Sequence, residues 1–289
     1  MDTKHELRTN PTTKTIDIQR LRCANRRVMC SVFAALLLIG AGANRASAWG
    51  ITWSDEFTGA SSGAQPWSGN WSYELGGGGW GNNELETYVN SWANSHMVWD
   101  GTGTDSQALR IEAQTDTGAW NGHWYSARIN SYGHHLVVPG SYVEFRCKFP
   151  NSGRGYWPAA WMLGTVGGQW PACGEIDVAE EVDGQWENHQ SLHMPNWDPT
   201  VVKTISNSTT TYHNYGAWWP ADGSSITFNV DGVNTATFSR GGGGTWEFNT
   251  NNRFFMIINL AIGGNFPGNP NSGTAVNGDF FVDYVRQYN

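Results

Sequence analysis

Short segments in which apolar and polar residues alternate most limit what this chain can fold into. They recur at 109–113, 142–149, 226–230, 254–262 and 280–288, separated by clusters of Gly, Asn, Asp and Pro. A period of two residues places neighbouring side chains on opposite faces of a strand, and the clusters favour turns. No pattern of a helix of ten or more residues interrupts them. The sequence therefore predicts an all-β protein, a sandwich or jelly roll in a single domain.

Local turn signals support this prediction. Asp231-Gly232 stands between two apolar segments, and such a pair tolerates the positive φ angles of a tight hairpin turn. Two runs of four glycines, 76–79 and 241–244, predict mobile or tightly turning loops.

The first 48 residues have the composition of a leader. A basic stretch ends at Arg26-Arg27, an apolar run spans Val28–Ala43, and Ala46-Ser47-Ala48 follows. This order is typical of a secretory signal peptide, and the apolar run is too short to favour a membrane anchor. We therefore expect residues 1–48 to be removed and residues 49–289 to be secreted as the folded domain.

The composition after residue 48 limits the choice of partner. The leader holds 8 of the 17 Lys and Arg and 3 of the 25 Asp and Glu, so residues 49–289 have a net charge of −13. This charge repels nucleic acid and anionic membranes, and neither is an expected partner. All 17 Trp also lie in this part. Their rings can stack on sugars or fill a β-sheet core, and composition alone does not decide between the two.

Cysteine and cofactor motifs are uninformative or missing. Cys147 and Cys173 are the only cysteines after the leader, and nothing in the sequence brings them together, although export permits a disulfide. The sequence lacks the motifs of nucleotide-binding loops and zinc proteases. We therefore expect chemistry that requires no cofactor.

The segment 175–181, with the sequence EIDVAEE, carries the clearest chemical signal. On a strand, Glu175 and Asp177 point to one face while Ile176 and Val178 point to the other. Crowded carboxylates repel each other and raise each other's pKa, so placing them on one face destabilises the fold. We therefore expect these carboxylates to take part in catalysis. Cleavage of a glycosidic bond needs such a pair, one carboxyl ionised and the other protonated.

Periodicity leaves the second acid of this pair open. Strict alternation from Glu175 selects Glu181. One β-bulge near Val178–Ala179 would instead turn Glu180 onto the same face as Glu175.

The segment Glu175–Glu180 resembles the bulged E-x-D-x-x-E signature of glycoside hydrolase family 16, in its laminarinase-like branch. Matching motifs cover nearly the whole of residues 49–289. They are Asp55–Phe57, Trp71–Glu84, Ser126–Arg128, Gly155–Leu163, Trp170–Gly174, Asn259–Gly268 and Val282–Tyr288. The resemblance implies a concave, concanavalin-like β-jelly-roll sandwich whose acidic strand lines a sugar cleft. It further implies a retaining endo-glycosidase that hydrolyses internal β-1,3-glucosidic bonds of neutral, laminarin-type β-glucans. We expect the secreted domain to be a monomer.

The resemblance also implies roles for individual residues. By position, Glu175 is the nucleophile, Asp177 its assisting acid and Glu180 the general acid/base. A structural calcium would be held by the Asp283 side chain and the carbonyls of Glu56 and Gln107. Polar and aromatic residues would bind the sugar chain, namely Asn83, Arg128, Trp157, Trp161, Trp170 and His193.

Two departures from the family pattern concern substrate contacts. Phe266 stands where laminarinases usually carry Trp, and the stretch Met194–Trp197 differs from the usual glycine-rich sequence. The same mechanism acting on mixed-link β-1,3-1,4-glucan, or on a galactan such as agarose, is therefore an alternative. A lectin-like module that binds β-glucan without turnover is another.

Overall fold

The computed structural model describes residues 49–58, 62–100 and 106–289, which belong to one folded unit. The predicted signal peptide lies outside these residues. The described residues form 17 β-strands and no helix, so the all-β prediction is confirmed. Within the same ranges, no helix is long and apolar enough to cross a membrane.

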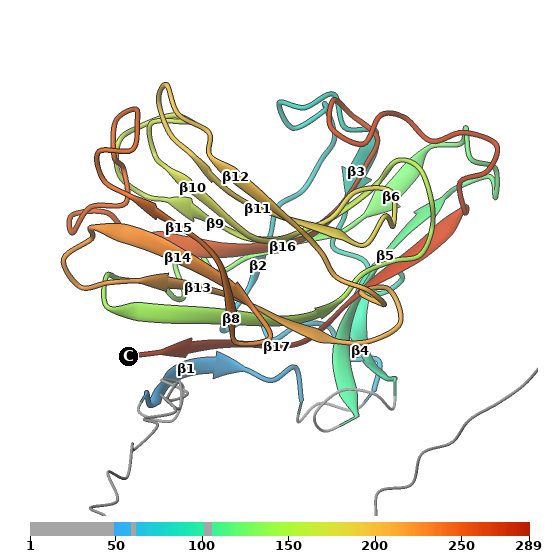
Figure 1. Cartoon of the computed structure of the whole chain (residues 1–289). Helices are drawn as coiled ribbons and strands as arrows, with labels where there is room; N and C mark the ends of the chain where they lie inside the picture. The colour runs from blue at the N-terminus through green and yellow to red at the C-terminus, as the bar shows by residue number, and fades with distance from the viewer. Residues whose placement is uncertain (1–48, 59–61, 101–105) are drawn as a thin grey trace, which may run out of the picture. The chain divides into compact units, whose positions relative to one another are not determined.

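The strands form two sheets that pack face to face (Figure 1). The larger sheet runs in the order β15 (Val233–Ser239), β14 (Ser225–Val230), β13 (His213–Trp219), β8 (Ser141–Lys148), β17 (Asn277–Tyr288), β5 (Gln107–Thr115), β6 (Trp124–Ser126) and β3 (Glu86–Tyr88), with β1 (Ile51–Asp55) beside β17 and β4 (Ser95–Trp99) beside β5. The smaller sheet runs β12 (Thr200–Thr204), β11 (Glu187–His193), β10 (Glu175–Glu180), β9 (Tyr156–Gly164), β16 (Phe254–Ile262), β7 (Arg128–Asn130) and β2 (Ser72–Tyr73).

Alternating side chains from both sheets fill the core. Along β8, Val143, Phe145 and Cys147 are buried while the residues between them are half-buried. β16 lies between β9 and β7 and is buried along its whole length. The core covers one of its faces, and the cleft residues described below cover the other. One face of the smaller sheet therefore packs on the apolar core, and its other face can carry polar groups.

The predicted hairpin and the cysteines can be compared directly with the structure. Asp231 and Gly232 join β14 to β15 with φ angles of +50° and +77°, as a tight primed turn requires. Cys147 and Cys173 are both buried free thiols, so the disulfide that export would permit does not form.

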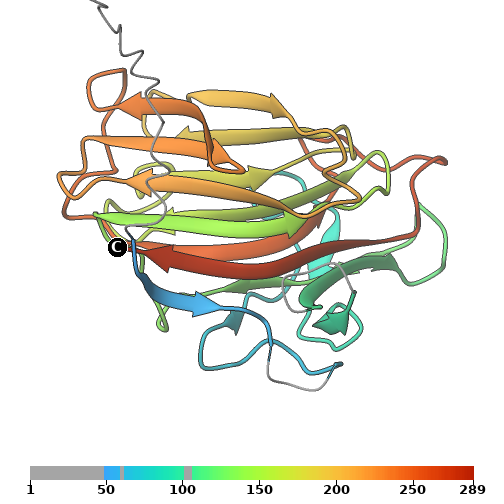
Figure 2. The same ribbon diagram turned by 60° about the horizontal axis from the view of Figure 1, so that its bottom comes forward.

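Strand β17 ties the two ends of the described chain to the larger sheet. It lies between β8 and β5, and β1 pairs with its C-terminal part (Figure 2). Gly50 N donates a hydrogen bond to Asn289 O at 3.3 Å. Both ends of the described chain therefore lie at the larger sheet, and the loops around the site described below lie at the smaller sheet.

Candidate active site

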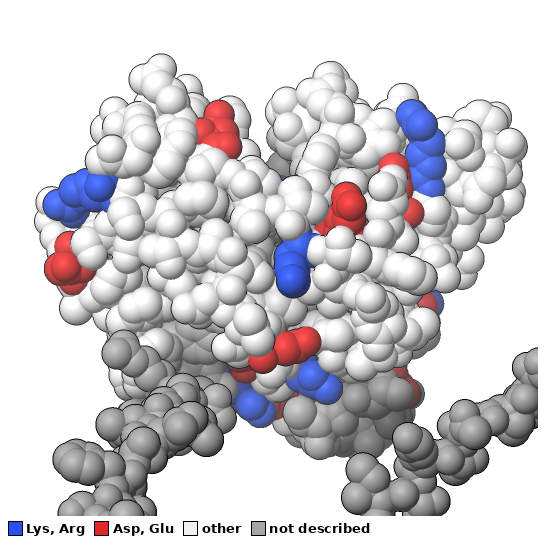
Figure 3. Space-filling view, viewed as in Figure 1, with Lys and Arg blue, Asp and Glu red and all other residues white. Residues whose placement is uncertain are grey.

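The exposed face of the smaller sheet forms the floor of a cleft of about 670 Å³. Side chains from β7, β9, β10, β11, β12 and β16 line it, and loop residues such as Trp80, Trp170 and Phe266 form its walls. The space-filling view has a notch at its upper edge, and charged side chains are few on the face shown (Figure 3). Aromatic rings thus share the lining of the cleft with polar side chains, and three of its acids, Glu175, Asp177 and Glu180, come from β10.

A β-bulge brings the third acid to that place. In the pairing of β10 with β9, Asp177 lies opposite Trp161, but Ala179 rather than Val178 lies opposite Ala160. The pairing of β10 with β11 shifts in the same interval. The extra residue turns Glu180 onto the face of Glu175 and Asp177, and all three line the cleft.

Glu181 occupies the opposite face of the sheet. It is 1% exposed and accepts a hydrogen bond from Ser208 Oγ at 2.8 Å. Burial raises the pKa of this carboxyl to about 7, but Glu181 does not line the cleft. Strict alternation, which would place Glu181 beside Glu175, is therefore wrong at this strand.

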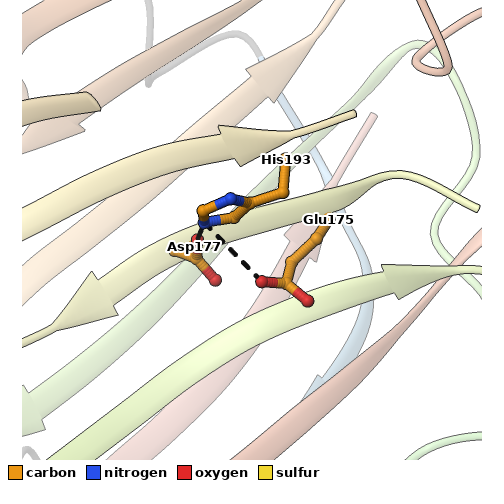
Figure 4. A group of neighbouring side chains, drawn as sticks. All are labelled: Glu175, Asp177 and His193. Atoms are coloured by element: carbon orange, nitrogen blue, oxygen red, sulfur yellow. Dashed lines mark ion pairs between the residues drawn. The ribbon is translucent and has the colours of Figure 1, made fainter. Parts of the chain in front are cut away.

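The ring of His193 lies beside the carboxylates of Asp177 and Glu175 (Figure 4). Its Nε2 is 3.0 Å from Asp177 Oδ2 and 3.8 Å from Glu175 Oε1. Burial opposes a charge on the ring, but the carboxylates around it prevail and raise the pKa of His193 to about 10. The cluster therefore contains a fixed cation at neutral pH.

The two glutamates have different surroundings. Burial and the neighbouring Asp177 raise the pKa of Glu175 well above its usual range, while the His193 cation lowers it. Burial and Asp177 raise the pKa of Glu180 to about 8. Glu180 Oε1 accepts a hydrogen bond from Trp157 Nε1 at 2.8 Å, a neutral donor. The His193 cation lowers the pKa of both glutamates and so opposes the burial that favours their protonated forms.

Arg128 is held between two aromatic rings. Its guanidinium carbon lies 4.9 Å from the ring centres of both Trp80 and Trp161, and its Nε pairs with Glu74. Trp161 Nε1 donates to Asn259 Oδ1 at 2.7 Å. This ordered stack presents a polar edge beside an aromatic wall, an arrangement suited to sugar hydroxyls and sugar rings.

The other expected sugar-binding residues divide into two groups. Trp157, Trp161, Arg128 and His193 line the cleft together with Trp170, whose ring is 58% exposed. Asn83 does not, because its Nδ2 donates to Asn265 Oδ1 at 2.9 Å across the neighbouring loop. Its neighbours in the sequence, Asn82 and Glu84, line the cleft in its place.

A buried polar network beside Arg128 was not anticipated from the sequence. Glu84 accepts hydrogen bonds from Asn82 Nδ2 at 3.1 Å and from Tyr88 Oη at 3.2 Å. Asn259 Nδ2 in turn donates to Tyr88 Oη at 3.1 Å. The only hint in the sequence is the spacing of Glu84, Glu86 and Tyr88, which places all three on one side of an extended segment.

Glu86 adjoins this network and is as buried as Tyr88. It is 1% exposed, and its Oε2 accepts a hydrogen bond from the Ile262 amide at 2.6 Å. Burial and the adjacent Glu84 raise the pKa of Glu86 to about 9, so it is protonated at neutral pH.

His189 is a further cleft residue that sequence reasoning missed. It lies directly opposite Glu180 in the pairing of β10 with β11. Its ring packs edge-on against Phe266, with centres 5.1 Å apart, and burial lowers its pKa. The sequence offered alternation along β11 as a signal, since residues 189, 191 and 193 share one face.

Metal binding has one compact candidate among the described residues, the cluster of Glu175, Asp177 and His193, whose ligand atoms lie within 4.8 Å of one another. A metal needs the neutral imidazole, however, and His193 is a cation here. A metal ion would therefore have to displace a proton from this ring.

The expected calcium ligands meet at a different place. Asp55 pairs with Val285 and Leu109 with Val282, so the strand register brings Glu56 and Gln107 close to Asp283 on β17. Asp283 Oδ2 already accepts a hydrogen bond from Arg146 Nε at 2.9 Å. A guanidinium at that oxygen competes with a divalent cation for the carboxylate.

Fold and cleft together define a β-jelly roll of the glycoside hydrolase class. Residues 87–268 match the family model described as the XgeA-like, catalytic GH16 domain. Among solved structures, the endo-beta-1,3-glucanase from Pyrococcus furiosus is similar with a TM-score of 0.71 and 32% identity, over 83% of this chain and 94% of that one. The chain belongs to glycoside hydrolase family 16.

Two relatives of known name are equally similar in sequence. The glucan endo-1,3-beta-glucosidase A1 of Niallia circulans is 33% identical over 275 residues, which cover 82% of this chain and 37% of that protein. The keratan-sulfate endo-1,4-beta-galactosidase of Sphingobacterium multivorum is 33% identical over 253 residues, which cover 82% of this chain and 54% of that protein. The chain thus spans only part of either relative, and sequence identity alone does not separate the two substrates.

Proposed function

We propose that this protein is a retaining endo-glycosidase that hydrolyses internal β-1,3-glucosidic bonds of laminarin-type glucans. The observation that carries the proposal is the bulge in β10, because it places Glu180 in one cleft with Glu175 and Asp177. A sugar-binding module without activity would have no use for three crowded carboxylates, whose repulsion costs stability.

In the proposed mechanism, Glu175 attacks the anomeric carbon while Glu180 gives its proton to the leaving oxygen. This step forms a glycosyl ester on Glu175 and releases one part of the chain. Glu180, now ionised, takes a proton from water, which attacks the same carbon and releases Glu175. Two inversions at one carbon give net retention.

The charges around the two acids support these roles. Glu175 lies 3.8 Å from the His193 cation, which favours the ionised form that a nucleophile needs. The pKa of Glu180, raised to about 8, keeps its proton available at neutral pH. Asp177 lies between the two glutamates along β10 and can hold His193 in place through their 3.0 Å ion pair.

Substitution of the acids tests the mechanism. Glu175→Gln should abolish hydrolysis, and Glu180→Ala should lose activity that azide restores as a β-glycosyl azide. Glu181→Ala is the matched control, since Glu181 lies outside the cleft. Full activity in Glu175→Gln would refute the proposed nucleophile.

The cleft favours a neutral glucan over a sulfated galactan. Four of its lining residues are acids, namely Glu84, Glu175, Asp177 and Glu180. Such a lining repels sulfate groups, and one of its cations, Arg128, is already paired with Glu74. Chromatography and NMR of the early products from laminarin, lichenan, agarose and keratan sulfate would decide. A ladder of β-configured laminari-oligosaccharides is expected, and galactose-containing products would refute the glucan assignment.

The remaining features of the proposal concern processing and assembly. We propose that residues 1–48 direct export and are then removed, which N-terminal sequencing of the secreted protein tests. We further propose that the domain is a monomer, testable by light scattering, and that calcium binds near Asp283 as a structural ion in exchange for Arg146. Calcium would rigidify the join of β1, β5 and β17 and would take no part in the reaction.

A further inference from the structure

The loop after β11 returns the chain toward the active site. Trp197 N donates to Met194 O at 3.2 Å, so the chain turns through Pro195 and Asn196. Asp198 follows this turn, and its Oδ1 accepts a hydrogen bond from His193 Nδ1 at 3.2 Å. The stretch that departs from the family pattern in the sequence thus delivers a carboxylate to the histidine of the site.

His193 is therefore enclosed by acids on both ring nitrogens. Nε2 faces Asp177 and Glu175 from β10, and Nδ1 faces Asp198 from the loop. The Trp170 ring packs beside it, with centres 6.0 Å apart. A neutral imidazole has one N–H donor, whereas acceptors at both nitrogens favour the form that carries two protons.

The glycine run Gly241–Gly244 supports this loop. A Cβ on Gly242 would lie 2.4 Å from Cη2 of Trp197, and a Cβ on Gly243 would lie 2.9 Å from its Cγ. Thr245 N donates to Pro195 O at 3.1 Å. The run is a tight turn, one of the two alternatives that the sequence left open, and its lack of side chains lets Trp197 lie directly on the backbone.

Aromatic packing holds the same tryptophan from other directions. The ring of Trp197 lies 6.3 Å from Phe238 and 6.4 Å from Trp246. With its ring in contact with glycines and aromatics, Trp197 has little freedom to move. The backbone of Asp198, the next residue, is therefore held in place by the packing of Trp197, although the Asp198 side chain is 61% exposed.

We propose that Asp198 is a positioning residue for the proposed glycosidase reaction. It holds His193 as a doubly protonated ring beside Glu175 and Asp177, and Gly241–Gly244 fixes Asp198 in place through Trp197. The His193 cation then stabilises negative charge on Glu175, the proposed nucleophile. The expected effect on kcat/KM rests on the proposed function. The expected protonation of His193 rests on the structure alone.

Asp198→Asn tests the first part. Because the ion pair is partly exposed, we expect kcat/KM on laminarin to fall about two- to fivefold and the NMR titration midpoint of His193 to fall by about 0.3 to 0.7 units. Asp231→Asn is the matched control. It breaks a second Asp–His pair, in which Asp231 Oδ2 is 2.7 Å from His213 Nδ1, outside the cleft. The control should leave kcat/KM and the His193 titration unchanged.

Gly243→Ala tests the second part. Gly243 has no left-handed φ, so the added methyl acts only through its contact with Trp197. We expect the same downward shift of the His193 titration as in Asp198→Asn. Gly273→Ala is the control, because Gly273 also lacks a left-handed φ and its nearest neighbour, Asn271 Oδ1, would be 3.3 Å away.

The outcomes separate this inference from the proposed function. An unchanged His193 titration in Asp198→Asn, with Asp198→Ala as the second variant, would overturn it whatever the enzyme cleaves. An unchanged titration in Gly243→Ala would overturn the role of the glycine run. Full activity of Glu175→Gln would instead refute the proposed mechanism while leaving the His193 titration as a valid test. Restored kcat/KM in Asp198→Glu would support positioning by charge.

Discussion

Replacing Trp157 by Phe isolates one hydrogen bond to the proposed acid/base. Trp157 Nε1 donates to Glu180 Oε1 at 2.8 Å, and its ring packs edge-on against Phe266 with centres 5.5 Å apart. Phenylalanine preserves a ring for this packing but removes the donor. Because the donor stabilises the ionised form of Glu180, its loss raises the pKa of that carboxyl.

The size of this change follows from the strength of the bond. A hydrogen bond to a charged group contributes about 1.5–3 kcal/mol, and 1.36 kcal/mol corresponds to roughly one pKa unit. The pKa of Glu180, about 8 in the native protein, should therefore rise by about one to two units. The alkaline limb of kcat/KM reports the acid of the free enzyme, so it should move upward by the same amount.

The assay is the pH dependence of kcat/KM on laminarin between pH 5 and about 10.5, where the limb would be resolved. Trp161→Phe is the matched control, because Trp161 lies on the same strand and donates to Asn259 instead. It should weaken sugar binding without moving the alkaline limb. If Trp157→Phe leaves the limb where it is in the native enzyme, Glu180 is not the acid that it reports.

Three further predictions concern stability. Glu86, whose pKa is raised to about 9, stabilises the fold fully below its unfolded pKa near 4.5 and progressively less as the pH rises toward 9. Glu86→Gln should therefore raise Tm between pH 7 and 9 and flatten its pH dependence, and an unchanged pH dependence would refute the raised pKa of Glu86. Phe254 is fully buried in β16, so Phe254→Ala should lower the free energy of unfolding by about 3–5 kcal/mol, as measured by urea denaturation. A decrease below about 1 kcal/mol would contradict the place of Phe254 in the core. If calcium binds as proposed, EDTA should lower Tm and CaCl₂ restore it in the native protein, with no response in Asp283→Asn; a response that persists in Asp283→Asn would place the ion elsewhere.

Much of the fold could be predicted from local pattern. The alternation in 142–149 predicts the strand that the structure shows as β8, with Phe145 inside and its neighbours half-buried. Asp231-Gly232 predicted its own turn, because only a few residue types tolerate two successive positive φ angles. Within the site, the spacing of Glu175 and Asp177 placed both on one face for the same reason.

Contacts between distant segments were beyond such reasoning. Glu86 reads as an ordinary surface acid in the sequence, yet the packing of its strand buries it. The indole of Trp157 was expected only as a sugar platform, whereas the structure shows its N–H bound to Glu180. Asp198 gave no signal at all, since its pairing with His193 depends on the turn between them.

The sequence by itself determined that the chain forms β-strands and that one of them carries acids on one face and apolar residues on the other. Periodicity left Glu180 and Glu181 open and the family resemblance implied Glu180, but only the tertiary structure shows which of the two lies in the cleft. Both choices are compatible with the local residues, and the register of β10 against β9 and β11 selects the bulge. Periodicity determines which way a side chain points along a regular strand, whereas a break in regularity is set by the hydrogen bonds that neighbouring strands make available.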